Sequence, residues 1–183
     1  MVRGNHILAH WMGAGKPRTV LAASLVLDLP LIVVCPAHVI PSWWREAQKC
    51  NVPAPSVYSY EGAVAAINIG KIATTDSFVL ALDEATAFKN HRSRRSIAIA
   101  KLCRMAARVY ALTGTAMPNN PIELFVLCEL VHPKCFGGLA KGYYKFAKRY
   151  CGARTETIVV RGGAEREVFV IPPLASIPDT ERT

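Results

Sequence analysis

The stretch HILAHWMGAGKPRT, His6 to Thr19, decides the fold expected for this chain. An apolar run at residues 7–9 leads into a glycine-rich loop, and residues 16–28 have the alanine and leucine content of a helix. Glycines let backbone N–H groups turn inward, while a lysine and a helix N-terminus add positive potential. The stretch therefore predicts a strand, a phosphate-binding loop and a helix. The residues of the loop are Gly13, Ala14, Gly15, Lys16 and Pro17.

Two positions depart from the usual phosphate-loop pattern. His10 stands where a glycine is expected, and Pro17 stands where serine or threonine usually follows the lysine. Proline is tolerated in the first turn of a helix, so Pro17 need not disturb the fold. Taken alone, the loop leaves a second interpretation open: a plain glycine turn between a strand and a helix.

Further apolar runs alternate with helical patterns along the chain. We expect strands at residues 29–36, 56–59, 78–82 and 109–112, and helices at 42–50, 93–107, 121–131 and 141–150. This alternation predicts an α/β fold of three layers, a central, mainly parallel sheet with helices on both faces. Ligands of such sheets bind at the carboxyl ends of the strands.

The helix after Pro41 reads SWWREAQKC, and Ser42 is expected to cap it. Trp43 and Trp44 are adjacent, so they must point to different sides of this helix. We therefore expect one of the two indole rings to be buried and the other to be partly exposed.

Composition limits the classes of protein to consider. The chain has 183 residues, of which 51% are hydrophobic, and a net charge of +9. This predicts one globular domain, and the positive charge suits a polyanion such as nucleic acid. The six cysteines show no C-x-x-C pair, so we expect reduced, mostly buried thiols in an intracellular protein. We expect no membrane span and no export signal.

A second polar cluster follows the apolar run FVLAL. There Asp83 and Glu84 come directly after a predicted strand. In nucleotide hydrolases such a pair supplies one carboxylate for magnesium and one that orients or deprotonates the attacking water. The sequence predicts the first role for Asp83 and the second for Glu84. A solvated turn or a helix cap is the alternative interpretation.

A third cluster, Thr113, Gly114 and Thr115, follows the strand expected at residues 109–112. The two hydroxyls can link a nucleotide site to a neighbouring surface. A Gly-Thr turn before the helix at residues 121–131 explains the same letters. The joint order and spacing of the three clusters favour the functional interpretation.

These stretches together resemble the first ATPase lobe of Swi/Snf-type chromatin-remodelling and annealing helicases of helicase superfamily two, with the annealing branch most similar. The resemblance covers residues 7 to about 152. It is carried by ILAHWMGAGK, LIVVCPAHVIPSWWREAQK, VLALDEATAFKN, YALTGTAMPNNPIELFVLCELVHPKCFG and FAKRYC. It implies a RecA-like P-loop lobe that forms half of an ATP-driven translocase on double-stranded DNA.

The resemblance also implies roles for particular residues. Lys16 would contact the β and γ phosphates of ATP, Asp83 the Mg²⁺ ion and Glu84 the water. Thr113 to Thr115 would sense which nucleotide is bound. The backbone at Pro36 and Ala37 and the N-terminus of the Ser42 helix would lie on a DNA phosphate.

Departures from that family shape the functional expectation. Pro17 replaces the threonine that ligates magnesium, and it also lacks a phosphate-facing N–H. The family's adenine-recognition segment and its second lobe are expected to lie outside this chain, in another chain or a missing part. Because a second-lobe arginine contributes on the order of 10³ to 10⁵ in rate, we expect weak hydrolysis by this chain alone. The alternative is a non-catalytic regulatory module that binds DNA or a partner.

Two further features concern the surface and the C-terminal part. The basic run HRSRR contains Arg92, Arg94 and Arg95 and is a candidate DNA-contacting face, although a solvated helix face explains it equally well. We expect the lobe to span residues 1–152, followed by an extension at 153–183 with a hairpin near residues 157–171 and a frayed tail.

Overall fold

A computed structural model describes residues 4–72, 77–115, 121–159 and 164–172. Its centre is a five-stranded sheet in the order β1-β5-β4-β2-β3, and each pairing is parallel. The strands are β1 (His6–Ala9), β2 (Leu31–Cys35), β3 (Ser56–Ser59), β4 (Val79–Leu82) and β5 (Arg108–Thr113). The predicted strands are thus confirmed within one or two residues.

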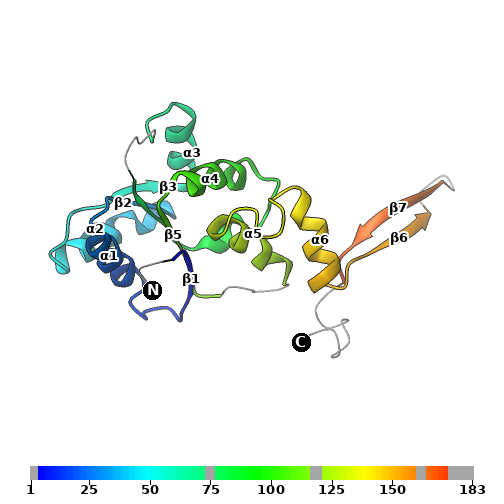
Figure 1. The fold of residues 1–183 in the computed structure, drawn as a ribbon, viewed down its shortest axis with the longest axis horizontal. Helices are drawn as coiled ribbons and strands as arrows, with labels where there is room; N and C mark the ends of the chain where they lie inside the picture. Colours follow the sequence, from blue (N-terminus) through cyan, green and yellow to red (C-terminus); the bar gives the residue numbers. More distant parts are fainter. Residues whose placement is uncertain (1–3, 73–76, 116–120, 160–163, 173–183) are drawn as a thin grey trace.

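Helices cover both faces of this sheet because its strands are apolar on both sides. In β2, Leu31 and Val33 point to one face, while Ile32 and Val34 point to the other. The first face is covered by α1 (Lys16–Leu27) and α2 (Ile40–Lys49). The second is covered by α3 (Tyr60–Asn68), α4 (Arg94–Met105) and α5 (Ile122–Val131), as Figure 1 shows. The predicted three-layer α/β fold is confirmed.

The start of α2 differs from the prediction. A 3₁₀ turn, Ala37–Val39, runs directly into the helix, so α2 begins at Ile40 and Ser42 lies inside its first turn. The Ser42 hydroxyl accepts a hydrogen bond from Arg45 at 3.1 Å instead of capping backbone N–H groups. The prediction that Ser42 caps this helix was therefore wrong. The tryptophan prediction is confirmed, since Trp43 is 1% exposed and Trp44 is 49% exposed.

Helix α3 was not predicted from the sequence. It begins after Ser59, whose hydroxyl accepts the Gly62 N–H at 3.0 Å as an N-cap. Ala63 and Ala66 are buried on the inner face of this helix. The alanine-rich helix carries few large apolar residues, which is why periodicity alone did not reveal it.

The C-terminal part packs on α5 through aromatic rings. Helix α6 (Lys141–Tyr150) brings Phe146 against Phe125 and Phe136, with ring centroids 5.5 and 4.9 Å apart. Beyond it, β6 (Arg154–Val159) and β7 (Glu165–Val170) form the predicted antiparallel hairpin, which extends away from the sheet (Figure 1). Residues 160–163 and all but the first residue of the tail predicted at 172–183 lie outside the described residues.

Glu129 is a buried acid that organises the loop between α5 and α6. The side chain is 3% exposed, and its carboxylate accepts the backbone N–H groups of Lys134, Phe136 and Gly138 at 2.9, 2.7 and 3.2 Å. A buried carboxylate needs such donors because its desolvation is costly. Glu129 thereby fixes the loop on which α6 packs.

Most of the cysteine thiols are buried or half-buried, as expected from the sequence. Cys35, Cys103 and Cys151 are buried, whereas Cys135 is exposed, and burial raises the pKa of the Cys103 thiol to about 12. Among the described residues, no helix has both the length and the apolar character needed to span a bilayer. Within the same ranges, no group of three or more metal-ligating side chains comes together.

Gly142 provides a test of the packing between α6 and the preceding loop. A Cβ at Gly142 would lie 2.7 Å from the Phe136 carbonyl oxygen and 3.1 Å from the Phe125 ring. Overpacking costs about 1–3 kcal/mol, whereas alanine gains about 1 kcal/mol of helix propensity over glycine. Gly142→Ala should therefore lower the free energy of unfolding by up to about 2 kcal/mol, measured by urea denaturation.

Lys145→Ala, at an exposed position of the same helix, serves as the control and should leave stability nearly unchanged. A more stable Gly142→Ala variant would contradict the described packing.

Candidate nucleotide-binding site

The three polar clusters predicted from the sequence follow the carboxyl ends of three neighbouring strands. Ala9 of β1 pairs with Thr113 of β5, and Leu82 of β4 pairs with Ala111 of β5. Because adjacent strands lie about 4.8 Å apart, the ends of β1 and β4 flank β5 at a separation of about 10 Å. The loops that follow these strands therefore start from the same edge of the sheet.

The loop between β1 and α1 has the backbone geometry of a phosphate cradle. Gly13 and Gly15 adopt positive φ angles of 82° and 75°, a conformation that favours glycine. A Cβ at either position would meet nothing within 4 Å, so open space lies in front of both residues. Ala14 N–H closes the turn by donating to the Trp11 carbonyl at 3.2 Å. The loop thus offers the open, glycine-lined surface on which phosphate oxygens fit.

Lys16 is held across this loop. Its side chain is 8% exposed, and Nζ donates to the carbonyl oxygens of His10 and Trp11 at 2.8 and 3.2 Å. An ammonium has three donors, so two hydrogen bonds leave one for an anion. These two hydrogen bonds keep the positive charge of Lys16 at the loop rather than in solvent.

A cavity of about 370 Å³ opens at the start of α1. Its volume lies at the lower end of the range for small-molecule sites. Lys16 contributes a cation to its wall, whereas Pro17 contributes neither an N–H nor a hydroxyl. The residues that line it are Gly13, Gly15, Lys16, Pro17, Arg18 and Glu46.

Asp83 lies at the end of β4 and is 8% exposed. Its two carboxylate oxygens accept hydrogen bonds from Trp43 Nε1 at 2.9 Å and from the Glu84 N–H at 3.0 Å. Each oxygen keeps a further lone pair, so the carboxylate can still bind a hard cation such as Mg²⁺. The sequence predicted a buried tryptophan here but not that its indole orients the acid.

Glu84 differs from Asp83 in its environment. Its side chain is exposed, and its backbone is left-handed, with φ of 48°. The buried hydroxyl of Tyr60 faces the carbonyl oxygens of Asp83 and Glu84 at 2.9 and 3.2 Å and donates to them. Burial, followed by the charges of Asp83 and Glu84, raises the pKa of Tyr60, which stays a donor. Tyr60 fixes this strained corner, and sequence reasoning missed it.

Thr113 and Thr115 form a closed turn after β5. The buried Thr113 hydroxyl accepts the Thr115 N–H at 3.0 Å and donates to the Thr115 carbonyl at 2.8 Å. Gly114 lies beside the phosphate loop, since a Cβ there would be 3.7 Å from Met12 Cγ. The structure thus places this turn next to the glycine loop, with the Thr113 hydroxyl engaged inside the turn.

The three candidate DNA-contacting arginines have different surroundings. Arg92 is exposed and donates to the Tyr144 hydroxyl at 2.6 Å, and Arg94 is exposed at the first residue of α4. Arg95 pairs with Glu61 at 2.5 Å, and its guanidinium lies 5.0 Å from the centre of the Tyr60 ring. The charge of Arg95 is therefore partly used inside the molecule.

Pro36 and Ala37 lie just after β2, at the same edge of the sheet as the phosphate loop. Ala37 is exposed and opens the 3₁₀ turn that precedes α2. Ser42 is half-buried in the first turn of α2. These residues place a helix start, with its positive end, at the rim of the sheet.

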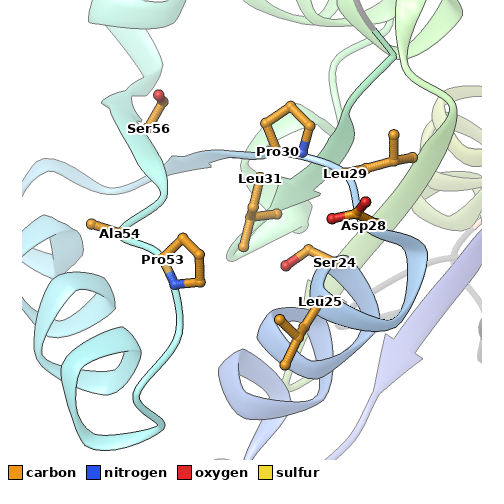
Figure 2. A pocket seen from close by; sticks show the side chains of 9 residues that line it. All are labelled: Ser24, Leu25, Asp28, Leu29, Pro30, Leu31, Pro53, Ala54 and Ser56. Carbon is orange, nitrogen blue, oxygen red and sulfur yellow. The ribbon is translucent and has the colours of Figure 1, made fainter.

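A second cavity, of about 300 Å³, lies at the opposite edge, where β2 and β3 begin (Figure 2). Its wall includes Leu25, Pro30 and Pro53, and its polar residues are Ser24, Asp28 and Ser56. The Ser24 hydroxyl donates to the Leu21 carbonyl at 2.9 Å. This cavity has no glycine loop and no lysine, so the candidate nucleotide site is the cavity at α1.

Known chromatin-regulator and DNA-helicase proteins are similar to this chain in sequence. Two relatives are a SWI/SNF-related matrix-associated actin-dependent regulator of chromatin subfamily A-like protein 1 homolog from Caenorhabditis elegans and the DNA annealing helicase and endonuclease ZRANB3 from Bos taurus. They are 29% and 27% identical to this chain over 82% of its length, and the matches span 24% and 16% of the relatives' own lengths. The chain thus corresponds to a quarter or less of these proteins.

Solved structures show the same fold. The Sulfolobus solfataricus SWI2/SNF2 ATPase core in complex with dsDNA matches 80% of this chain with a TM-score of 0.65 and 21% identity, which corresponds to 35% of that structure. The Pyrococcus furiosus Hef helicase domain matches 71% with a TM-score of 0.60 and 13% identity, which is 34% of that structure. The SNF2-related domain matches residues 57–159, more than half of the sequence. The chain therefore belongs to the SNF2-related domain family.

Proposed function

We propose that this chain is the N-terminal ATP-binding lobe of a DNA-dependent ATPase that translocates on double-stranded DNA inside the cell. The observation that carries the proposal is the shared edge of the sheet, where Lys16, Asp83 and the turn at Thr113 follow β1, β4 and β5. Membership of the SNF2-related domain family and the DNA-associated names of the relatives support it.

The residues of the candidate site include groups that can bind the phosphates of ATP and groups that can bind Mg²⁺. Lys16 and the N–H groups of the glycine loop bind phosphate oxygens, and Asp83 offers carboxylate oxygens to magnesium. Glu84 is exposed beside it and can orient a water and accept its proton. The magnesium nucleotide supplies the transferable phosphoryl group, and the protein contributes positioning and charge.

Pro17 makes this a weakened nucleotide site. The hydroxyl that would complete the magnesium shell is absent, and so is one backbone donor. A missing charge-assisted hydrogen bond is worth about 1.5–3 kcal/mol, or roughly ten- to hundredfold in affinity. Thr19 does not replace it, because its hydroxyl donates to the Gly15 carbonyl at 3.3 Å.

A second RecA-like lobe is the partner proposed for the rim that bears the nucleotide site. Trp11 and Met12, in the phosphate loop, are 87% and 86% exposed. Apolar side chains gathered at a ligand site are typical of a surface that is covered during function. The Thr113 to Thr115 turn lies beside this loop and is the proposed coupling element between nucleotide and partner lobe. Residues 1–152 form the proposed lobe, and 153–183 the proposed extension.

DNA is the second proposed partner. The 3₁₀ turn at Ala37 and the first turn of α2 at Ser42 are the proposed sources of N–H groups for one backbone phosphate, whereas Pro36, which precedes them, has no N–H to give. Arg92 and Arg94 add an exposed basic face, to which Arg95 contributes less because it pairs with Glu61. A regulatory DNA-binding module without catalysis is the second candidate function, and Pro17 is the observation that favours it.

Nucleotide binding by the 183-residue chain tests the proposal. Mg²⁺-ATP should bind weakly, Lys16→Ala should weaken it about ten- to hundredfold, and Pro17→Thr should strengthen it by a similar factor. The reason is that the first change removes, and the second adds, a charge-assisted interaction with phosphate or metal. Titration with a fluorescent ATP analogue measures these dissociation constants.

The regulatory alternative makes a different prediction for the same titration. If neither the wild type nor Pro17→Thr binds nucleotide, and Pro17→Thr shows no DNA-stimulated hydrolysis with a complementary second lobe, the catalytic proposal is wrong. DNA binding that survives in this case would support the regulatory module.

Trp43→Phe tests whether the indole positions Asp83. Removal of Nε1–H frees one carboxylate oxygen, and loss of such a supporting hydrogen bond typically lowers metal affinity about 10- to 100-fold. The Mg²⁺ concentration for half-maximal nucleotide binding should rise by about tenfold at least, whereas binding without magnesium should change little. Trp44→Phe, at the exposed neighbour, is the matched control. Equal magnesium dependence in both variants would refute the positioning role.

The basic face can be tested by salt dependence. The double variant Arg92→Gln/Arg94→Gln should bind a short DNA duplex more weakly and should reduce the slope of log affinity against log salt by about 1–2. Arg104→Gln, at the other end of α4, is the control and should keep the slope. Binding that ignores salt in the wild type would argue against phosphate contacts.

A further inference from the structure

Arg18 is a second cation on the wall of the nucleotide cavity. It follows Pro17 as the third residue of α1, and its side chain is 62% exposed. The cavity also has Gly13, Gly15 and Lys16 on its wall. Arg18 therefore shares one space with the loop that is built to hold phosphate, although the phosphate-loop pattern assigns no role to this position.

In this structure, the side chain of Arg18 forms an ion pair with Glu46. Its Nε donates to Glu46 Oε2 at 2.8 Å, while Lys49 Nζ donates to Glu46 Oε1 at 3.0 Å. These hydrogen bonds, first that of Arg18 and then that of Lys49, hold the pKa of Glu46 below its ordinary value. Glu46 thus stays ionised and has two cationic partners, so it keeps one if Arg18 moves away.

Glu46 itself lies on the cavity wall, which matters for an anionic ligand. A carboxylate beside a polyphosphate is repelled by it, so Glu46 opposes nucleotide binding. The exposed pair between Arg18 and Glu46 is screened by water and easily exchanged. A guanidinium binds phosphate through two parallel N–H donors, which makes phosphate a fitting alternative partner for Arg18.

We propose that Arg18 is a nucleotide-binding residue that leaves Glu46 and binds a phosphate of the nucleotide, which offsets the N–H and the hydroxyl that Pro17 cannot supply. This inference rests on the proposed ATP-binding function and extends it. Lys49 remains on Glu46 and neutralises it. The site then holds two cations, Lys16 and Arg18, on the phosphate chain.

Four variants test the proposal in titrations of ATP and AMP with Mg²⁺. Arg18→Gln should weaken ATP binding about tenfold and AMP binding by a smaller factor, because fewer phosphates are within reach. Glu46→Gln should strengthen ATP binding, since it removes a repulsive charge and frees the guanidinium. Arg18→Lys should retain part of the affinity. Lys49→Gln removes the second cationic partner of Glu46 and should have a smaller effect on ATP binding than Arg18→Gln.

The double variant Arg18→Gln/Glu46→Gln separates direct contact from simple neutralisation. If Arg18 binds phosphate, the double variant should bind ATP about tenfold more weakly than Glu46→Gln alone. If Arg18 only neutralises Glu46, the two should bind equally, and the proposal is then wrong.

The failure of this inference can be told apart from the failure of the proposed function. If Lys16→Ala weakens ATP binding about ten- to hundredfold while Arg18→Gln has no effect, only the proposed role of Arg18 is wrong. If no variant binds ATP, including Glu46→Gln, both the proposed nucleotide site and the proposed role of Arg18 are wrong.

Discussion

The structure depends on one constraint: the central strands β2, β4 and β5 are buried on both faces, so polar side chains of a site have to lie where these strands end. Leu31 to Cys35 are all buried, and β4 is equally apolar. A charged side chain inside either strand would lose its water without a partner. Because the five strands run in parallel, their carboxyl ends share one edge, and Lys16, Asp83 and Thr113 belong to segments at the ends of strands that finish there.

The two acids after β4 differ in their surroundings. Trp43 and the Glu84 N–H hold Asp83 from both oxygens, so its position is fixed before any ligand arrives. Glu84 is exposed and has a left-handed backbone conformation, and the Tyr60 hydroxyl donates a hydrogen bond to its carbonyl oxygen. Preorganised charge of this kind lowers the reorganisation that a reaction requires. The helices α2 and α3 thus contribute buried aromatic groups to a site whose exposed residues lie in loops.

Much of this arrangement could be predicted from the sequence, because strands buried on both faces read as continuous apolar runs. The glycine loop and the Asp-Glu pair were each open to a second interpretation, and their joint order after predicted strands favoured a functional site. The insertion of β5 between β1 and β4, and the hydrogen bonds of Trp43 and Tyr60, depend on contacts between distant segments. Local patterns do not encode such contacts. The Ser42 cap failed for a related reason, since the 3₁₀ turn before α2 brought the helix start forward.

The β6–β7 hairpin is joined to the lobe mainly at its base. Phe169 lies against Tyr144 of α6 at 5.0 Å between ring centroids, and the outer parts of both strands are exposed. Six residues of strand extend about 20 Å, so a rotation of α6 by about 10° would carry the far end about 3–4 Å. The hairpin would therefore magnify any tilt of α6, and a pair of spectroscopic labels, one on the hairpin and one on the lobe, would report such a tilt as a change of distance.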